Sequence, residues 1–370
     1  MSFQPDRRSF MLGGSLLLAG CATSSLTQTS APGPGTGAWA TSSPEAKGLS
    51  SAALKAAAAQ LGAPGERQGL VVVRGGELVF EQYWANDYAR ATPDWQNVSF
   101  SSGKSWGSTM VGRAQYQGYL DINDLASKYV PAETTGFNPA TTIKHLLTMS
   151  SGGTLNTKPS SVPPKRLDDP TPPGAGVEYE WHDAPEDGKP EGYGTTIQPG
   201  TQFIYDGAPA DHLADIVSAA TGQTSLKYMT DEVIKKLGCR HTGYQPEGVD
   251  SNGNVRIGGS MLISCRDMAR LGQLYLNGGR WGRKRLISED YVRQATSPSA
   301  TREGYGYLWW LNADDSIAKA PKSMFFAAGA LGQYCFVLPE QDMVISTMGF
   351  GRPGLSTDAA WDALAQILPA

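Results

Sequence analysis

Residues 99–109 read SFSSGKSWGST, and this stretch carries the most informative spacing in the chain. It contains an S-x-x-K motif, in which Ser101 precedes Lys104 by three positions. A helical stretch is expected from Ser101 to about Gly118, and residues three apart on a helix share one face. The lysine amine can therefore lie beside the serine hydroxyl and accept its proton. The spacing predicts a serine nucleophile with a lysine base.

Two competing interpretations of short motifs are disfavoured. Ser316 and Lys319 repeat the S-x-x-K spacing, but they lie in a polar stretch between expected strands, where no helix would hold them together. Residues 103–105 read Gly-Lys-Ser, the end of a phosphate-binding loop of the form G-x-x-x-x-G-K-[ST]. That loop needs a glycine at position 98, where this chain has Val98. Nucleotide binding is therefore a poor explanation.

A hydrolase without a catalytic histidine needs another group to carry protons. The four histidines are scattered and never form an H-E-x-x-H or zinc-cluster pattern, so each is more simply a surface or packing residue: His145, His182, His212 and His241. Tyr205, in TQFIYDG just before an expected helix, is the best-placed tyrosine. A phenol beside an ammonium group can pass a proton to a leaving group.

Composition excludes several classes of protein. The chain has 370 residues, of which 40% are hydrophobic and 18% are charged. This length allows a substantial core in one large domain or two, without support from disulfides. The net charge is −4, and no basic block is present, so nucleic acid is not an expected partner.

The first 21 residues are typical of an export signal. Arg7 and Arg8 precede an apolar stretch over 10–20, and Cys21 follows it. A helix of about ten residues spans roughly 15 Å, half of a bilayer's hydrocarbon, so this stretch is too short for a transmembrane anchor. The paired arginines resemble a twin-arginine signal. Residues 18–21 resemble a bacterial lipoprotein processing site, which predicts lipidation of Cys21 and a periplasmic or cell-envelope location; a soluble secreted protein is the alternative.

The segment after the signal is expected to be a flexible linker. Residues 22–46 are rich in Ser, Thr, Gly, Pro and Ala, a composition that cannot bury much apolar surface. Three cysteines remain beyond Cys21, so at most one intrachain disulfide is expected: Cys239, Cys265 and Cys335. The apolar surroundings of Cys335 indicate a small buried side chain.

The rest of the chain, residues 47–370, is expected to form an α+β domain, an α/β sandwich. Residues 70–84 read as a β-hairpin around Gly75-Gly76, behind an Ala-rich helix over 51–61. Four strand-like segments lie near the other end, at 305–311, 324–329, 332–339 and 342–349, and a helix over 357–368 closes the chain. The expected architecture is an antiparallel sheet flanked by N- and C-terminal helices. Residues from about 100 to 300 form a mostly helical insert with a long irregular loop over 153–200.

Several segments together resemble the serine β-lactamase-like superfamily. The resemblance is to the branch that includes class C β-lactamases, DD-peptidases, family VIII carboxylesterases and 6-aminohexanoate-dimer hydrolase. It covers about residue 47 to the C-terminus, in the family's order and spacing. The residues that carry it are SSGK at 101–104, LLTMSSGG at 146–153, Tyr205, RDMARLGQLYLNGGRW at 266–281, GYGYLWW at 304–310 and AAGALGQYCFVLPEQDMVI at 327–345.

The resemblance implies a role for each matching residue. Ser101 would be the acyl-forming nucleophile, Lys104 the general base and Tyr205 the proton relay to and from the leaving group. The oxyanion hole would use the backbone amides of Ser101 and of Ala330, which follows the glycine of the family's K-T-G strand, here Gly329. No metal or cofactor is implied.

Two departures from the family pattern bear on the substrate. Residues 327–329 read Ala-Ala-Gly in place of Lys-Thr-Gly, so the cation and hydroxyl that would hold a substrate carboxylate are missing. Tyr205-Asp206-Gly207 stands in place of Tyr-x-Asn, so the side-chain amide is missing. A site without the partners of a substrate's polar groups discriminates poorly for that substrate. Esters or linear amides are therefore the expected small-molecule substrates.

The residues expected to contact the substrate are Gly329, Trp309, Trp310, Asp206 and Gly207, the two tryptophans by lining an apolar acyl pocket. Two alternatives stay open. One is a penicillin-recognising β-lactamase or DD-peptidase, and the other is a non-catalytic envelope binding protein of the same fold. The oligomeric state is left open.

Overall fold

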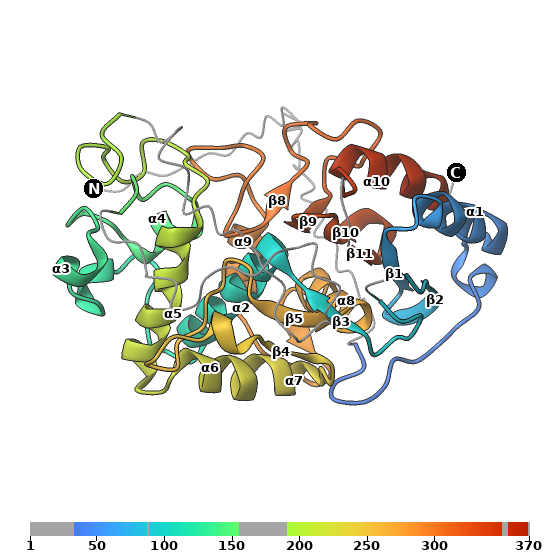
Figure 1. The fold of residues 1–370 in the computed structure, drawn as a ribbon, viewed down its shortest axis with the longest axis horizontal. Helices are drawn as coiled ribbons and strands as arrows, with labels where there is room; N and C mark the ends of the chain where they lie inside the picture. Colours follow the sequence, from blue (N-terminus) through green and yellow to red (C-terminus); the bar gives the residue numbers. More distant parts are fainter. Residues whose placement is uncertain (1–32, 87–88, 155–190, 350–353, 369–370) are drawn as a thin grey trace, which may run out of the picture.

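The computed structural model describes residues 33–86, 89–154, 191–349 and 354–368. Its main sheet has six antiparallel strands in the order β2-β1-β11-β10-β9-β8. The strands come from both ends of the described chain (Figure 1): β1 (Arg67–Arg74), β2 (Glu77–Tyr83), β8 (Trp310–Leu311), β9 (Phe325–Gly329), β10 (Gln333–Leu338) and β11 (Met343–Gly349). The two ends therefore build one sheet, as the sequence predicts.

The two faces of this sheet bury two separate cores. Side chains alternate across a strand, so Leu70 and Val72 of β1 face one core while Val71 and Val73 face the other. The first core is covered by α1 (Ser51–Gly62), α10 (Thr357–Leu364) and η7 (Ala365–Ile367). The second is covered by α8 (Cys265–Leu276), which packs on β1, β10 and β11. The expected sandwich with terminal helices is confirmed.

The helical part of the molecule lies beside the sheet, with α2 (Gly103–Tyr116) between the two (Figure 1). This part also contains a small three-stranded sheet in the order β3 (Gln96–Val98), β5 (Met261–Ser264) and β4 (Thr242–Tyr244). The remaining helical elements are η1 (Glu45–Lys47), η2 (Phe100–Ser102), η3 (Ala126–Lys128), α3 (Ala132–Thr135), α4 (Ile143–Leu147), α5 (Gly207–Thr221), α6 (Ser225–Tyr228), η4 (Met229–Ile234), α7 (Lys235–Leu237), η5 (Pro246–Gly248), α9 (Glu289–Ala295) and η6 (Pro339–Gln341). A hairpin of β6 (Arg280–Trp281) and β7 (Lys284–Arg285) completes the fold.

Most expected elements are present, with one clear exception. The hairpin over 70–84 forms β1 and β2, and Ser356 caps α10 by accepting the Ala359 N–H at 3.2 Å. The strand expected over 305–311 is wrong except for its last two residues, since only Trp310 and Leu311 join the sheet. The Gly304 and Gly306 backbones lie so close to neighbouring atoms that added Cβ atoms would meet Asp314 Oδ2 at 2.3 Å and Ala295 O at 2.0 Å.

The flexible linker expected over 22–46 is wrong for residues 33–46. Arg270, on α8, donates to the Gly35 and Gly37 carbonyls at 3.1 and 2.7 Å. Its guanidinium lies 5.5 Å from the Trp39 ring centroid, and Trp281 Nε1 donates to the Gly35 carbonyl at 2.8 Å. A Gly- and Ser-rich composition predicts disorder. Here Arg270 and Trp281 of the body hold the segment, and its own Trp39 packs against both.

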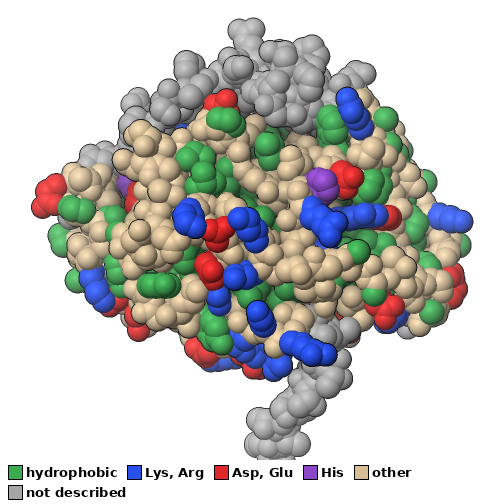
Figure 2. Space-filling model, turned by 90° about the horizontal axis from the view of Figure 1, so that it is seen from below, with side chains coloured by type: hydrophobic (Ala, Val, Ile, Leu, Met, Phe, Trp, Pro, Cys, Tyr) green, Lys and Arg blue, Asp and Glu red, His purple; other side chains and the backbone are tan. Residues whose placement is uncertain are grey.

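The expectations for the export signal and Cys21 lie outside the described residues, as do His182 and most of the irregular loop over 153–200. Within the described ranges, no helix combines the length and apolar character needed to cross a membrane. The face that carries α6 and α7 shows basic and acidic side chains close together (Figure 2). Lys227 and Lys235 each pair with Asp231 there. The three cysteines of the described chain are free thiols, and Cys335 is fully buried in β10 as predicted.

Candidate active site

Helix α2 runs through the middle of the molecule and is buried on nearly every side. Small residues make this possible. An added Cβ at Gly107 would lie 2.5 Å from Ile257 Cδ1, and one at Gly112 would lie 2.6 Å from the Tyr291 ring. Close packing on all sides fixes the N-terminal end of α2, which is the end that carries the S-x-x-K motif.

Ser101 and Lys104 meet as the motif predicts. Ser101 lies in η2, one turn before Lys104, and Lys104 Nζ donates to Ser101 Oγ at 2.9 Å. Lys104 is only 4% exposed, while Ser101 is partly exposed. The preceding residue, Phe100, has a φ of 46°, which is unusual for a bulky side chain. Such strained backbone occurs where the surrounding structure holds a functional residue in place.

A second acceptor fixes the lysine. Lys104 Nζ also donates to the Gly258 carbonyl at 3.1 Å, and the Gly258 N–H donates to Asp211 Oδ1 at 2.8 Å. Asp211 lies on α5, is 2% exposed, and its other carboxylate oxygen lies 3.5 Å from Arg256 Nε. The buried Asp211 carboxylate thus fixes the backbone of Gly258, whose carbonyl in turn positions Lys104. Asp211 has no signal in the sequence, because its role depends on a contact 47 residues along the chain.

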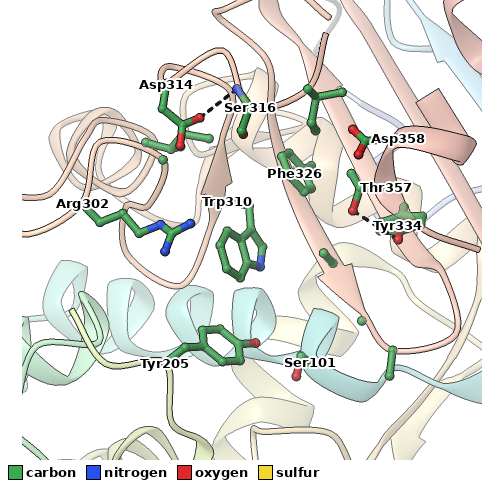
Figure 3. Close-up of a pocket in the computed structure, with 16 residues that line it drawn as sticks. Ser101, Tyr205, Arg302, Trp310, Asp314, Ser316, Phe326, Tyr334, Thr357 and Asp358 are labelled. Atoms are coloured by element: carbon green, nitrogen blue, oxygen red, sulfur yellow. Dashed lines mark hydrogen bonds between the residues drawn. The ribbon is translucent and has the colours of Figure 1, made fainter. Parts of the chain in front are cut away.

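Tyr205 lies on the open side of the pair. Lys104 Nζ is 5.1 Å from the centroid of its ring, and Figure 3 shows the Tyr205 hydroxyl directed toward Ser101. The ring packs against Trp310 at 5.4 Å and Tyr305 at 6.2 Å. Burial raises the pKa of Tyr305 well above its usual value, so that neighbour stays a neutral phenol. The structure therefore brings Ser101, Lys104 and Tyr205 to one place.

The end of strand β9 lies against the nucleophile turn. An added Cβ at Gly329 would lie 2.3 Å from the Ser99 carbonyl oxygen and 3.1 Å from the Ser102 nitrogen. Only a glycine allows this approach, which explains why position 329 keeps the family's glycine. Gly329 and Ala330 line the same pocket as Ser101. Ala330, whose amide is the expected oxyanion donor, therefore lies in the same pocket as the expected nucleophile.

Two buried residues hold the turn that follows Gly329. Arg67 donates to the Gly332 carbonyl at 2.6 Å and to Leu331 O at 3.3 Å, and it is 2% exposed. Burial lowers the pKa of Arg67 to about 10, so it stays charged at neutral pH. Gln333 donates to Ala330 O at 3.4 Å. The sequence gives no sign of either role, since Arg67 lies 265 residues from the turn it supports.

The pocket beside Ser101 has a volume of about 400 Å³ and is lined by aromatic and charged side chains (Figure 3). Trp310, Phe326 and Tyr334 form its apolar part, so the structure places Trp310 in this pocket. The expectation for Trp309 is wrong. That side chain is fully buried, 4.5 Å from the Tyr275 ring and 5.3 Å from Phe325, in the core on the α8 side of the sheet.

Asp206 and Gly207 do not line this pocket either. Asp206 is 4% exposed and caps α5, accepting the Ala208 N–H at 3.0 Å, and Gly207 is the first residue of that helix. The expected substrate contacts at these two positions are therefore wrong. An aspartate directly before a helical pattern is an N-cap signal, which could have been recognised from the sequence.

Residues 103–107 also fit the G-x-S-x-G frame of an α/β-hydrolase elbow, which would make Ser105 a competing nucleophile. The structure excludes Ser105 from this role. It is 1% exposed inside α2, and its hydroxyl donates to the Leu308 carbonyl at 2.7 Å. Ser101 lines the pocket and Ser105 does not. Ser316 also lines it, but Lys319, its partner in the S-x-x-K spacing, pairs with Asp362 at 3.3 Å instead.

The three described histidines lie away from Ser101. His145 accepts the Thr142 N–H at 3.2 Å in a helix cap, and His212 Nδ1 lies 2.9 Å from Asp215. His241 pairs with Asp94 at 3.1 Å. The described residues contain no group of three or more His, Cys, Asp or Glu side chains arranged to hold a metal ion.

The pocket also contains charged residues that sequence reasoning missed. Arg302, Asp314 and Asp358 line it from three separate segments, the last at the start of α10. None belongs to a motif, and they come together only because the sheet places these segments around β9.

Comparison with known proteins gives a consistent picture. The model of the Beta-lactamase family matches residues 54–368. A protein of Salmonella schwarzengrund assigned as a D-alanyl-D-alanine carboxypeptidase is 24% identical over 347 residues, covering 77% of this chain and 78% of the relative. Two solved structures share the fold. One, from Bacillus anthracis and assigned as a 6-aminohexanoate-dimer hydrolase, has a TM-score of 0.59 at 19% identity, covering 83% and 79% of the two chains. The other is EstCE1, described as a hydrolase with promiscuous acyltransferase activity, with a TM-score of 0.61 at 16% identity, covering 85% and 98%.

Proposed function

This chain belongs to the beta-lactamase family, and from that membership we propose that it is a serine hydrolase in which carboxylic esters or linear amides acylate Ser101. The observation that carries the proposal is the 2.9 Å hydrogen bond from Lys104 Nζ to Ser101 Oγ at the edge of an open pocket. The amine and the hydroxyl are already in contact before any substrate arrives. A nucleophile and base within hydrogen-bond reach are the minimum for covalent catalysis.

The proposed reaction has two halves. In the first, Lys104 takes the proton of the Ser101 hydroxyl as Oγ attacks the substrate carbonyl carbon, and the carbonyl oxygen becomes an oxyanion. The backbone amides of Ser101 and Ala330 donate to this oxyanion. Each such donor is typically worth about 2.7 to 4 kcal/mol in the transition state. When the carbonyl re-forms, the bond to the leaving group breaks, and Tyr205 supplies the proton that the leaving group needs.

In the second half, water replaces the leaving group. Tyr205, left as a phenolate by the first half, accepts a proton from the water as its oxygen attacks the acyl carbon, while Lys104 still holds the proton taken from Ser101. The same two amides hold the second oxyanion. Collapse releases a carboxylic acid and returns the proton to Ser101 Oγ, so the residues end in the state in which they started.

The preference for esters and linear amides rests on two polar groups of the family that this site lacks. Ala327, at the position of the family's lysine, is fully buried in β9, and Asp206 caps a helix instead of offering an amide to the substrate. The alternative is a penicillin-recognising enzyme, which the likeness to the carboxypeptidase-assigned Salmonella protein favours. The two proposals differ in the expected substrate and agree on the acyl-enzyme.

A fluorophosphonate probe tests the acyl-enzyme. We expect labelling of the wild-type protein and no labelling of Ser101→Ala, with Ser105→Ala labelled like the wild type. A folded wild-type protein that resists the probe would support a non-catalytic binding protein instead.

A pair of chromogenic substrates tests the substrate class. We expect p-nitrophenyl butyrate to be turned over faster than nitrocefin. Faster turnover of nitrocefin would overturn the proposed preference and leave the acyl-enzyme intact.

We also propose that the chain is exported and anchored through a lipid on Cys21, on the strength of Arg7-Arg8, the short apolar stretch and Cys21. Expression of the full chain in a bacterium, followed by membrane fractionation, tests this. The wild type is expected in the membrane fraction and Cys21→Ala in the soluble fraction. Equal distribution of the two would contradict the anchor.

A further inference from the structure

We propose that Arg302 binds a carboxylate on the leaving-group side of the substrate, so that esters or amides of a carboxylate-bearing alcohol or amine are preferred. The inference rests on the proposed function, because it assumes that Ser101 is acylated in this pocket. It goes beyond that function by naming the charge that the leaving group carries.

Arg302 projects into the pocket that contains Ser101 and Tyr205. Its guanidinium carbon lies 4.7 Å from the Phe203 ring centroid and 5.4 Å from the Trp310 ring centroid. Figure 3 shows the group beside Trp310. Two aromatic rings thus hold the planar group in place, which lowers the entropy lost when it binds a ligand.

This guanidinium has no carboxylate partner among the described residues. Arg113, by contrast, pairs with Glu232 at 2.6 Å. Asp314, the carboxylate above Arg302 in Figure 3, instead accepts the Ser316 N–H at 3.2 Å. An arginine in a reactive pocket whose donors are unused by the described acidic side chains is available to a substrate anion.

The position of Arg302 identifies which part of the substrate it would meet. Arg302 and Tyr205 both pack on Trp310, and Phe203 is two residues before Tyr205. Because Tyr205 is proposed to protonate the leaving group, Arg302 lies on the leaving-group side. Asp358 lies toward α10, away from Arg302 (Figure 3), and a negative charge there disfavours an anion at that wall. The two charges favour one orientation for a substrate with a single anionic end.

This assignment also changes what the loss of the family's lysine means. Position 327 holds a buried alanine, so β9 supplies no cation, but a different segment places one in the same pocket. A guanidinium can hold a carboxylate through two parallel hydrogen bonds, which a lysine cannot. The enzyme therefore keeps recognition of an anion while presenting it from another direction.

The experiment compares phenyl butyrate with 3-carboxyphenyl butyrate, which differ by one carboxylate on the leaving group. We take the ratio of kcat/KM for the carboxylate ester to kcat/KM for the neutral ester in each protein, so that intrinsic reactivity cancels. In Arg302→Ala we expect this ratio to fall about tenfold, mainly through KM, because a charge-assisted hydrogen bond at a partly exposed site is lost. Arg302→Lys is expected to lie in between.

The matched control is Arg293→Ala, which removes an exposed arginine of α9 outside the pocket and is expected to leave the ratio unchanged. An unchanged ratio in Arg302→Ala, with both esters hydrolysed, overturns the inference and leaves the proposed function standing. If folded wild-type protein hydrolyses neither ester, the proposed function fails.

A binding measurement with catalytically inactive variants tests the role of Arg302 without any turnover. Calorimetry of 3-carboxyphenyl butyrate with Ser101→Ala is compared with the Ser101→Ala/Arg302→Ala double variant. About tenfold weaker binding to the double variant supports the carboxylate contact, and equal binding overturns it.

Discussion

The floor of the pocket and its outer wall are built in different ways. The floor consists of Ser101, Lys104 and Gly329, which lie in or against fully packed elements with little room for change. The outer wall carries Arg302 and Asp358, which are exposed and come from loops and a helix start. The floor matches the family's motifs, and the wall does not. Packing thus fixes the chemistry, while exposed side chains remain free to set the substrate.

The largest effect is expected at the floor, for Lys104→Ala. Removal of the base should lower kcat/KM for p-nitrophenyl butyrate by about 10³-fold, since a positioned base typically contributes about 10²- to 10⁴-fold. The control is Lys144→Ala, which removes an exposed lysine of α4. Measured across the alkaline range, the variant should stay inactive. Recovery of activity at high pH would show that Lys104 is a structural residue.

The next effect is expected at the contact between floor and strand, for Gly329→Ala. The added methyl group would lie 2.3 Å from the Ser99 oxygen and must push β9 away from the nucleophile turn. Loss of one oxyanion donor costs about 10²- to 10³-fold in kcat, so a fall of that size is expected. Gly243→Ala is the control, because an added Cβ there meets nothing within 4 Å. Full activity in Gly329→Ala would show that this strand does not form the oxyanion hole.

A smaller and substrate-dependent effect is expected for Tyr205→Phe, at the boundary between floor and wall. The ring that packs on Trp310 remains and only the hydroxyl is lost. For an alkyl ester or an anilide, whose leaving groups need a proton, kcat should fall about 10²-fold. For p-nitrophenyl butyrate the fall should be much smaller, because p-nitrophenolate leaves without a proton. An equal fall for both would argue against a proton relay.

The smallest effect on activity is expected behind the floor, at Asp211, which acts as a positioning residue through Gly258. Asp211→Asn keeps an oxygen that can accept the Gly258 N–H and should retain most activity. Asp211→Ala removes that acceptor and should lower kcat severalfold. Its free energy of unfolding should also fall by about 3 kcal/mol, as when one partner of a buried pair is removed.

Chemical denaturation and kcat together test this role. A stability loss in Asp211→Ala with kcat unchanged would separate Asp211 from catalysis. Rescue of kcat in Asp211→Asn is the expected sign that the hydrogen bond to Gly258 is what matters.

The same division explains how much the sequence could predict. S-x-x-K depends on helical spacing, and the β1-β2 hairpin depends on local turn chemistry, so both were predictable. Local patterns could not tell Trp309 from Trp310, because the two are adjacent and either could face the pocket. Asp206 directly precedes a helical pattern, which is an N-cap signal, and the structure places it as the cap of α5 and not as a substrate contact.

The wall was beyond prediction for a physical reason. The sheet alone brings Arg302 and Asp358 to the same pocket, and Arg67 supports a turn 265 residues away. The order of residues 33–46 was missed because Arg270, which binds their carbonyls, lies more than 230 residues along the chain. Composition describes a segment alone, and these contacts belong to pairs of distant segments.

Mass spectrometry of an acid-quenched reaction tests the central claim most directly. Wild-type protein mixed with p-nitrophenyl butyrate should carry one butyryl group, about 70 Da, and peptide mapping should place it on Ser101. Tyr205→Phe should carry it too, and Ser101→Ala should not. An adduct on Ser105, or undiminished turnover by Ser101→Ala, would contradict the assignment of the nucleophile.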